Sequence, residues 1–273
     1  MTTQARARAL YRACHPEPTM AVTAIAAGLA QATGGPAVVV GLAFLSGQLT
    51  TGWTNDWLDR DRDVASDRRD KPVVRGDVPA AVVSQAAAFA GLLCVPLSLA
   101  MGLAAGVVHL VAVASAFAYN ARLKSTLLSW APYALSFGLI PSIVTLAAED
   151  VRAPLWATGA GALLGVGAHL ANALPDLDDD AATGVHGLPH RLGATLSAAL
   201  SAVLLLAATV LLALGPDGEP GVLGWGAVGV AGVVTAVGLV LARRPGSRTA
   251  FLAAIVVALV DVALLLVRGA DLL

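Results

Sequence analysis

Charged residues are scarce in this sequence. Asp, Glu, Lys and Arg make up 13% of its 273 residues, whereas hydrophobic residues make up 57%, and the mean hydropathy is +0.77. A soluble domain usually has about 25% charged residues. We therefore expect lipid to surround most of the chain. Strand-like alternation of apolar and polar residues is also absent, which argues against a β-barrel.

Cysteines and aromatic residues are few as well. The two cysteines, Cys14 and Cys94, are far apart, one before the first expected span and one inside another. A disulfide between them is therefore not expected, and a zinc site would need more ligands at closer spacing. The net charge of −1 gives no reason to expect a nucleic-acid partner. Aromatic residues, at 5%, weigh modestly against a cavity with many aromatic walls.

Long apolar runs predict an all-α integral membrane protein with a single domain over residues 1–273, in which residues 1–16 form a tail. Charged or Gly/Pro-containing breaks separate runs of roughly 17–25 residues, which is the length that crosses a bilayer as a helix. The nine expected spans are 17–33, 36–57, 79–101, 103–121, 126–148, 154–175, 190–214, 221–242 and 248–268.

The basic residues are distributed very unequally between the two expected sides of the membrane. Of the 17 Lys and Arg residues, only Arg152 and Arg268 fall on the side opposite the N-terminal tail. Loops rich in Lys and Arg stay in the cytoplasm. We therefore expect a cytoplasmic N-terminus and, after nine spans, an extracytoplasmic C-terminus. A composition rich in Ala, Gly, Val, Arg and Asp is typical of a high-GC bacterial genome, and hence indicates the plasma membrane.

An acidic cluster follows the second expected span. If that span continues as a helix, Asn55, Asp59 and Asp63 share one face at spacings of four residues, with Asp56 beside them. A charge run at a helix end is more often a solvated loop than a binding site. The surrounding Arg60, Asp61 and Arg62 fit that simpler interpretation.

A second acidic cluster follows the sixth expected span on the same side of the membrane. Asn172, Asp176 and Asp180 repeat the spacing of the first cluster, with Asp178 and Asp179 between the last two. Two clusters with one spacing on one face favour a site over two solvated loops.

Carboxylate and amide oxygens in two facing clusters suit magnesium. This ion takes few protein carboxylates and completes its shell with water and substrate phosphates. Acidic groups facing each other would repel unless cations neutralised them, and a magnesium-bound diphosphate fits that pattern. Metal ions and basic residues also stabilise diphosphate as it leaves an allylic carbon. The candidate basic residues are Lys71, Arg75, Arg122 and Lys124.

These motifs resemble those of the UbiA superfamily of intramembrane prenyltransferases. Asn55-Asp56-x-x-Asp59-x-x-x-Asp63 is similar to its first Asp-rich motif, and Asp176-x-x-x-Asp180 to its second. Lys71-Pro72, Arg75-Gly76 and Tyr119-Asn120-x-x-Leu123-Lys124 resemble its intervening loops. The resemblance implies a helical bundle around a central cavity that is open to lipid and capped at the cytoplasmic side.

The resemblance also implies roles for residues of this sequence. The expected magnesium ligands are Asn55, Asp56, Asp59, Asp63, Asp176 and Asp180, with Asp179 a further candidate. The expected catalytic residues are Asp59, Asp63, Asp176, Asp180 and Lys124. The expected substrate-binding residues are Lys71, Arg75, Tyr119, Asn120, Arg122, His169 and Asn172.

Several polar residues keep two interpretations. His169 lies one helical turn before the second cluster, where it either lines an acceptor pocket or makes an interhelical hydrogen bond. Asp261 lies in the middle of the last expected span, where an ionisable group is costly and often functional, or simply hydrogen-bonded. His186 and His190 have no assigned role.

The combined prediction is an enzyme that transfers a prenyl group from a prenyl diphosphate to an aromatic or other lipophilic acceptor, with Mg²⁺ as cofactor. A terpene cyclase on the same scaffold would act on the diphosphate without an acceptor. A transporter or channel is a third alternative, although only Asp261 among the acids lies in mid-membrane.

Overall fold

The computed structural model describes residues 2–182, 184–241 and 249–273, and in these residues every regular element is a helix. The long helices are α2 (Pro16–Ala32), α3 (Ala37–Ala65), α4 (Ala80–Leu99), α5 (Leu103–Ala121), α6 (Ala131–Glu149), α7 (Leu155–Ala173), α9 (Leu188–Leu214), α10 (Gly221–Leu241) and α11 (Thr249–Val267). The short elements are α1 (Thr3–Arg12), η1 (Leu123–Ser125), η2 (Leu174–Asp176), α8 (Leu177–Ala182) and η3 (Gly269–Leu272).

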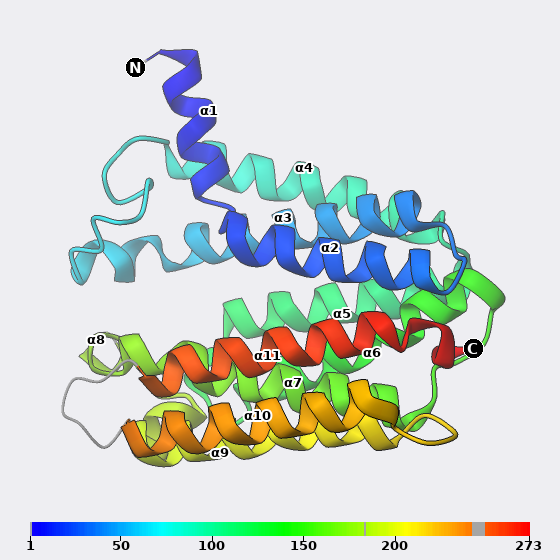
Figure 1. Cartoon of the computed structure of the whole chain (residues 1–273). Helices are drawn as coiled ribbons and strands as arrows, with labels where there is room; N and C mark the ends of the chain where they lie inside the picture. The colour runs from blue at the N-terminus through cyan, green and yellow to red at the C-terminus, as the bar shows by residue number, and fades with distance from the viewer. Residues whose placement is uncertain (1, 183, 242–248) are drawn as a thin grey trace.

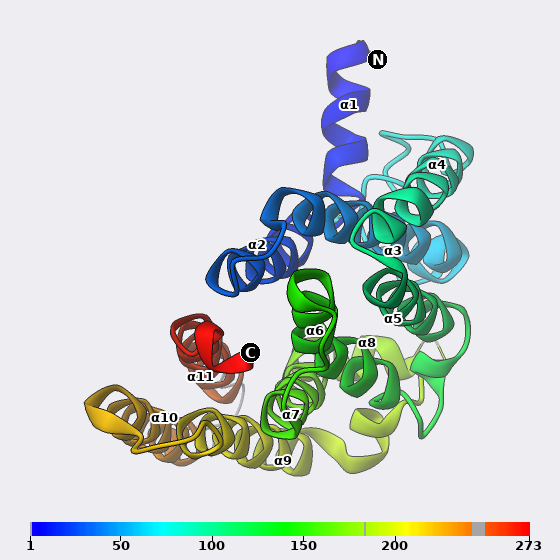
Figure 2. The same cartoon turned by 90° about the vertical axis from the view of Figure 1, so that its right-hand side faces the viewer.

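The long helices run side by side along roughly one direction, and α1 projects away from the bundle near one of its ends (Figure 1). The C-terminal end of α3 and the short helix α8 lie at this same end, while the C-terminus of the chain lies at the other. Viewed along the helices, α2 and α11 lie on the same side of α6, and α9 and α10 form an outer edge (Figure 2). Both Asp-rich segments therefore reach one end of the bundle, as their positions in the sequence predict.

The chain is a multi-pass membrane protein. Seven of the described helices are long and apolar enough to cross a bilayer, namely α3, α4, α5, α6, α9, α10 and α11. The outward-facing surface carries large apolar side chains such as Phe89, Leu155 and Val222, which are 65%, 88% and 89% exposed. Lipid is the solvent that favours such a surface. The expected all-helical membrane fold is confirmed, but the count of nine spans is not, because α2 has only 17 residues and α7 carries His169 and Asn172.

Several expected boundaries differ from the helices. The second expected span ends at residue 57, whereas α3 continues to Ala65 and keeps the whole first acidic cluster helical. The fifth was expected from residue 126, but α6 begins at Ala131 because residues 127–130 form a turn. The expected tail contains the helix α1. The described residues do not include 242–248, where two other expected boundaries fall.

The second acidic cluster does not continue its helix as the first one does. Helix α7 ends at Ala173, and the 3₁₀ turn η2 joins it to α8. Pro175 lies inside that turn, and its ring removes a backbone donor and disfavours a continuous α-helix. Asn172 therefore lies at the end of α7, Asp176 in η2 and Asp180 in α8, and the three do not share one helical face.

Helix α1 is attached to the bundle beside the first acidic cluster. The indole N–H of Trp53 donates to the carbonyl oxygen of Leu10 at 2.9 Å. The apolar contact that accompanies this bond is formed by Ala9, Ala13, Val73, Val78 and Val83. The contact joins α1 to the loop 66–79, so the N-terminal segment and the loop that carries Lys71 are packed together.

Asp261 has a partner on a neighbouring helix. Its side chain is fully buried, and one carboxyl oxygen lies 2.5 Å from the hydroxyl oxygen of Thr209 in α9. A hydrogen bond between two spanning helices stabilises their association in lipid. The contact favours the structural interpretation of Asp261 over a role in transport.

Glycines bring α6 and α7 into close contact. A methyl group added at Gly161 would lie 2.6 Å from the carbonyl oxygen of Phe137, and one at Gly165 would lie 2.5 Å from that of Tyr133. Small residues four apart allow this approach of helix backbones in membranes. His169 is the next residue at the same spacing, so the packing of these glycines positions its side chain.

We expect Gly165→Ala to lower the thermal unfolding midpoint of the purified protein, because the added methyl group meets backbone of α6. Gly229→Ala in α10 is the matched control, since nothing lies within 4 Å of a methyl group there. That control should leave the midpoint unchanged or raise it, because alanine favours a helix over glycine by up to about 1 kcal/mol. Equal midpoints for the two variants, measured by tryptophan fluorescence, would contradict the close packing.

Candidate active site

A cavity of about 600 Å³ lies at the end of the bundle where the two acidic clusters meet. Asp56 and Asp59 reach it from α3, Asp176 from η2 and Asp180 from α8. The clusters are more than a hundred residues apart in the sequence, and only the packing of α5 and α6 between α3 and α7 places them in one site. The structure brings the two acidic clusters together in one cavity, as the sequence predicts.

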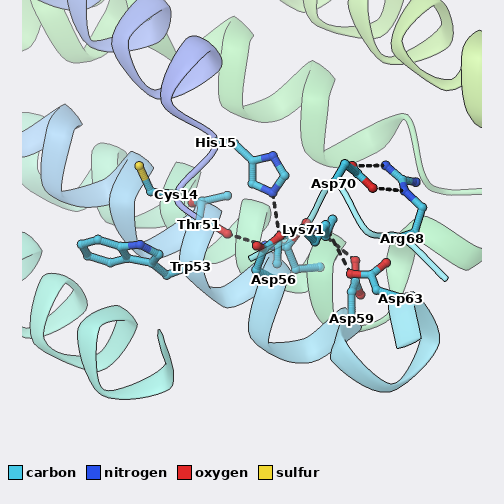
Figure 3. A network of polar contacts seen from close by, with 12 residues as sticks. Cys14, His15, Thr51, Trp53, Asp56, Asp59, Asp63, Arg68, Asp70 and Lys71 are labelled. Atoms are coloured by element: carbon cyan, nitrogen blue, oxygen red, sulfur yellow. Dashed lines mark hydrogen bonds and ion pairs between the residues drawn. The ribbon is translucent and has the colours of Figure 1, made fainter. Parts of the chain in front are cut away.

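Asp56 and Asp63 share one lysine. The ammonium nitrogen of Lys71 lies 2.9 Å from Oδ1 of Asp56 and 3.0 Å from Oδ2 of Asp63. Both aspartates are less than 10% exposed. His15 contacts Asp56 from the other side, with its Nε2 2.9 Å from the same Oδ1 (Figure 3). The loop 66–79 and the α1–α2 junction are thus both attached to the first cluster through one carboxylate.

Asp59 contacts the other lysine of the site. Lys124 in η1 donates to its Oδ1, and Arg62, one turn further along α3, lies 2.6 Å from its Oδ2. Asn55 donates to the same Oδ2 at 3.1 Å. The carboxylate therefore lies among three donors, two of them charged, and this arrangement compensates for its burial.

The two lysines have opposite pKa shifts although both are buried. Burial lowers the pKa of Lys71, but the charges of Asp56 and Asp63 outweigh it and leave the pKa above its ordinary value. Burial also lowers the pKa of Lys124, and Asp59 offsets this only in part, so the pKa remains below its ordinary value. The charge of Lys71 is thus compensated by two carboxylates, whereas that of Lys124 is compensated by one.

The second cluster is more open and has weaker partners. The guanidinium of Arg68 lies 3.7 Å from Asp176, and Nε2 of His190 lies 3.5 Å from Asp180. Burial raises the pKa of the Asp180 carboxyl, against the opposing effect of His190. Asn172 is exposed but lines the cavity. The side chains of Asp178 and Asp179 lie outside the described part, so the expected ligand role of Asp179 stays a prediction.

Some predicted site residues lie beside the cavity rather than in its wall. Asn120 accepts from Asn55 at 3.3 Å and donates to the backbone of Thr51, so it supports the first cluster from behind. Arg75 is exposed and pairs with Asp77 at 2.7 Å, and Arg122 is exposed at the end of α5. The structure brings neither arginine to the cavity. Tyr119, Lys71, Lys124 and His169 do line it.

The structure adds functional candidates that the sequence pattern did not identify. They are Arg12, His15, Arg62, Arg68 and His190. The spacing of three residues between Asp59 and Arg62 is a sequence signal for a helical ion pair. The other contacts join segments distant in the sequence, and no spacing rule would have found them.

The donor set fits magnesium together with a phosphate ligand. In the described part of the chain, no three His, Cys, Asp or Glu side chains form a ready metal site. The described lining residues include six acids and five Lys or Arg side chains. A diphosphate entering this nearly balanced cavity would be repelled unless cations came with it. Magnesium bound partly by carboxylate oxygens and partly by phosphate oxygens suits these residues.

Comparison with known proteins identifies a family and several solved structures that are similar to this chain. The sequence model of the family described as "UbiA prenyltransferase family" matches residues 18–264. A UbiA homologue from Archaeoglobus fulgidus, solved with GPP and Mg²⁺, is 17% identical with a TM-score of 0.72, covering 96% of this chain and 99% of that one. A UbiA homologue from Aeropyrum pernix K1, solved without ligand, is 20% identical with a TM-score of 0.68, covering 92% and 98%.

A third similar structure is described as digeranylgeranylglyceryl phosphate synthase. It is 13% identical with a TM-score of 0.67, and the match covers 98% of this chain and 99% of that one. These identities are low, so the similarity establishes a shared fold. A sequence search among curated proteins found no match.

We expect Lys71→Met to destabilise the protein when magnesium is absent, because Asp56 and Asp63 lose the cation between them. Removing one partner of a buried ion pair costs on the order of 3 kcal/mol. Adding Mg²⁺ should restore part of the lost thermal stability by supplying a cation to the same carboxylates. Arg69→Met is the control, because Arg69 pairs with Asp67 at the surface. A Lys71→Met protein as stable as this control would argue against the bridging role.

Proposed function

The chain belongs to the UbiA prenyltransferase family, and on that premise we propose that it transfers a prenyl group from a prenyl diphosphate to a lipophilic acceptor within the membrane, with Mg²⁺ as cofactor. The observation that supports this best is the convergence of both Asp-rich segments on one cavity lined by basic residues. The solved relatives with GPP and with DMAPP, each also holding Mg²⁺, have the same fold.

The diphosphate would bind between the two acidic clusters. The cavity wall provides ammonium groups from Lys71 and Lys124 and a guanidinium group from Arg68 to bind it. Asn55, Asp56, Asp59, Asp176 and Asp180 provide the oxygen atoms that would hold magnesium. Magnesium, when bound, would neutralise phosphate oxygens and stabilise the leaving diphosphate. In the structure Lys71 and Lys124 contact carboxylates of the first cluster, so a diphosphate bound here would exchange these contacts for contacts with phosphate.

Transfer breaks one bond and forms another at the same carbon. The bond between the first prenyl carbon and its diphosphate oxygen breaks, and the electron pair leaves with the diphosphate. A nucleophilic atom of the acceptor then bonds to that carbon and releases a proton. Lys124 is placed to donate to the developing charge on the leaving oxygen, because it lies at the cavity wall beside Asp59.

The aromatic residues lie where the prenyl carbon would carry positive charge. Tyr119 lines the cavity, and its ring contacts Tyr133 edge-on with the centroids 5.1 Å apart. An aromatic face attracts a cation through its quadrupole. Aromatic residues are few in the composition, but the fold gathers several of them beneath the acidic clusters.

We expect Asp59→Asn and Asp176→Asn to lower Mg²⁺-dependent release of diphosphate from GPP by about a hundredfold or more, since each removes charge from the site. Asp61→Asn is the matched control, because Asp61 lies on the same helix but is 92% exposed and pairs with the exposed Arg60. Purified protein in lipid nanodiscs and a coupled diphosphate assay provide the measurement. Unchanged release in both site variants would refute the proposed site.

The product distinguishes transfer from cyclisation. We expect mass spectrometry to detect lipophilic molecules enlarged by one prenyl unit when GPP and Mg²⁺ are supplied with a bacterial lipid extract. A cyclic hydrocarbon formed from the diphosphate alone, without any added acceptor, would instead assign the terpene-cyclase reaction.

We also propose that the acidic end of the bundle faces the cytoplasm of the plasma membrane, as the distribution of Lys and Arg indicates. Single cysteines at Asp61 and Asp217 would report on opposite ends, since both positions are exposed. In intact cells, a membrane-impermeant maleimide should label Asp217→Cys at once and Asp61→Cys only after lysis. The reverse labelling pattern would overturn this orientation.

A further inference from the structure

A buried hydrogen-bonded group lies beneath the acidic clusters and is not used by the diphosphate site. Nε2 of His169 lies 3.0 Å from the hydroxyl oxygen of Ser129, and the backbone N–H of Leu188 donates to that same oxygen at 3.0 Å. Ser129 is fully buried and His169 is 4% exposed. Three segments meet here: the loop after η1, helix α7 and the first residue of α9.

The hydrogen atoms of this group can be assigned by counting donors. Ser129 has one O–H, and the N–H of Leu188 already occupies one of its lone pairs. If Nε2 of His169 also donated to Ser129, the hydroxyl proton would be left without an acceptor in a buried place. A buried donor without a partner costs about 1–3 kcal/mol. Ser129 is fully buried, whereas Nδ1 of His169 is accessible from the cavity and its proton can be solvated there. Ser129 therefore donates to Nε2, and the ring proton of neutral His169 lies on Nδ1.

The Nδ1 atom is the part of His169 left for a ligand. Among the described residues no hydrogen-bond partner is recorded for it, and the His169 ring lines the cavity. The ring is held in place by Tyr133, with centroids 4.7 Å apart, and by Tyr119, with centroids 5.8 Å apart and the planes near perpendicular. A fixed donor that has no hydrogen-bond partner among the described residues thus faces the cavity.

The surroundings of His169 distinguish it from the diphosphate-binding residues. Its nearest rings belong to tyrosines, and it forms no ion pair with a described carboxylate, whereas Lys71, Lys124 and Arg68 all do. Gly187 allows close packing around Ser129 and His169. A methyl group at Gly187 would lie 2.5 Å from the carbonyl oxygen of Lys124 and 3.0 Å from Oγ of Ser129. His169 thus lies between the acidic clusters and the tyrosines, where a second substrate would meet the prenyl carbon.

We propose that His169 determines acceptor specificity by donating its Nδ1–H to an oxygen atom of the acceptor. The inference rests on the proposed prenyl transfer and narrows its second substrate to molecules that carry a hydroxyl, carbonyl or carboxylate oxygen near the atom that is alkylated. With Nε2 occupied and Nδ1 protonated, His169 binds the acceptor and does not remove its proton. An acceptor without such an oxygen leaves the buried Nδ1–H unpaired and is disfavoured.

The tautomer is tested first, by ¹⁵N NMR of histidine-labelled protein in nanodiscs. The His169 signals are identified by their loss in His169→Asn. We expect Nδ1 at the protonated, pyrrole-type position and Nε2 at the pyridine-type position. Ser129→Ala should move the equilibrium toward the Nε2–H form, because Nε2 loses its donor. A wild-type ring protonated on Nε2 overturns the proposal without involving any catalytic measurement.

Recognition of oxygen is tested with 1-naphthol and naphthalene, two probes of nearly equal size that differ by one hydroxyl group. In the presence of GPP and Mg²⁺, wild-type protein should bind 1-naphthol at least tenfold more tightly than naphthalene. One hydrogen bond that is left unmade accounts for about this factor. His169→Leu should abolish the difference, while His169→Asn, which keeps an N–H at the place of Nδ1, should retain most of it.

The outcomes separate this inference from the proposed function. Failure of the wild-type protein to release diphosphate from GPP with Mg²⁺ contradicts the proposed function. Normal release, together with equal binding of the two probes or no binding of either, contradicts the role of His169 alone. His169→Leu should keep its Mg²⁺-dependent affinity for GPP, and a loss of that affinity would assign the residue to the diphosphate instead. A thermal unfolding midpoint near that of the wild type confirms that each variant is folded.

Discussion

Three buried carboxylates on one helix are the constraint around which this structure is organised. Asp56, Asp59 and Asp63 are each less than 10% exposed, and they lie within two turns of α3. Like charges at this spacing repel strongly where water is excluded. Lys71 lies between two of them, and Lys124 lies against the third. The positions of the loop 66–79 and the turn η1 follow from this need for charge compensation.

The same ion pairs connect the scaffold to the proposed chemistry. Lys71 and Lys124 neutralise the carboxylates that would also hold magnesium, and the same ammonium groups would provide donors to a phosphate oxygen. The second cluster is more exposed and has longer contacts, with Arg68 and His190. One side of the cavity is therefore fixed by short contacts and the other is looser, an arrangement that suits entry of a charged ligand from the membrane surface.

Local spacing predicted some parts of the site well. The repeat of four residues in Asn55, Asp59 and Asp63 anticipated a helical acidic face, and α3 does continue through it. The same repeat in the second cluster wrongly predicted a continuous helical face, because Pro175 and the turn η2 interrupt the helix. All four candidate basic residues were predicted from their charge near the clusters, and the resemblance covers Lys71, Arg75 and Lys124. Lys71 and Lys124 line the cavity, whereas Arg75 and Arg122 lie outside it.

The sequence by itself determined that this chain is helical, that lipid surrounds it, and that its acidic and basic residues are concentrated in a few segments. Hydropathy and helical period carry that information because they depend on neighbouring residues. Tertiary structure alone decided that His15 contacts Asp56, that Arg68 reaches Asp176, and that Ser129 lies against His169. Each pair joins segments at least 40 residues apart, and the packing of whole helices sets such distances. The two acidic helix ends became one site for the same reason.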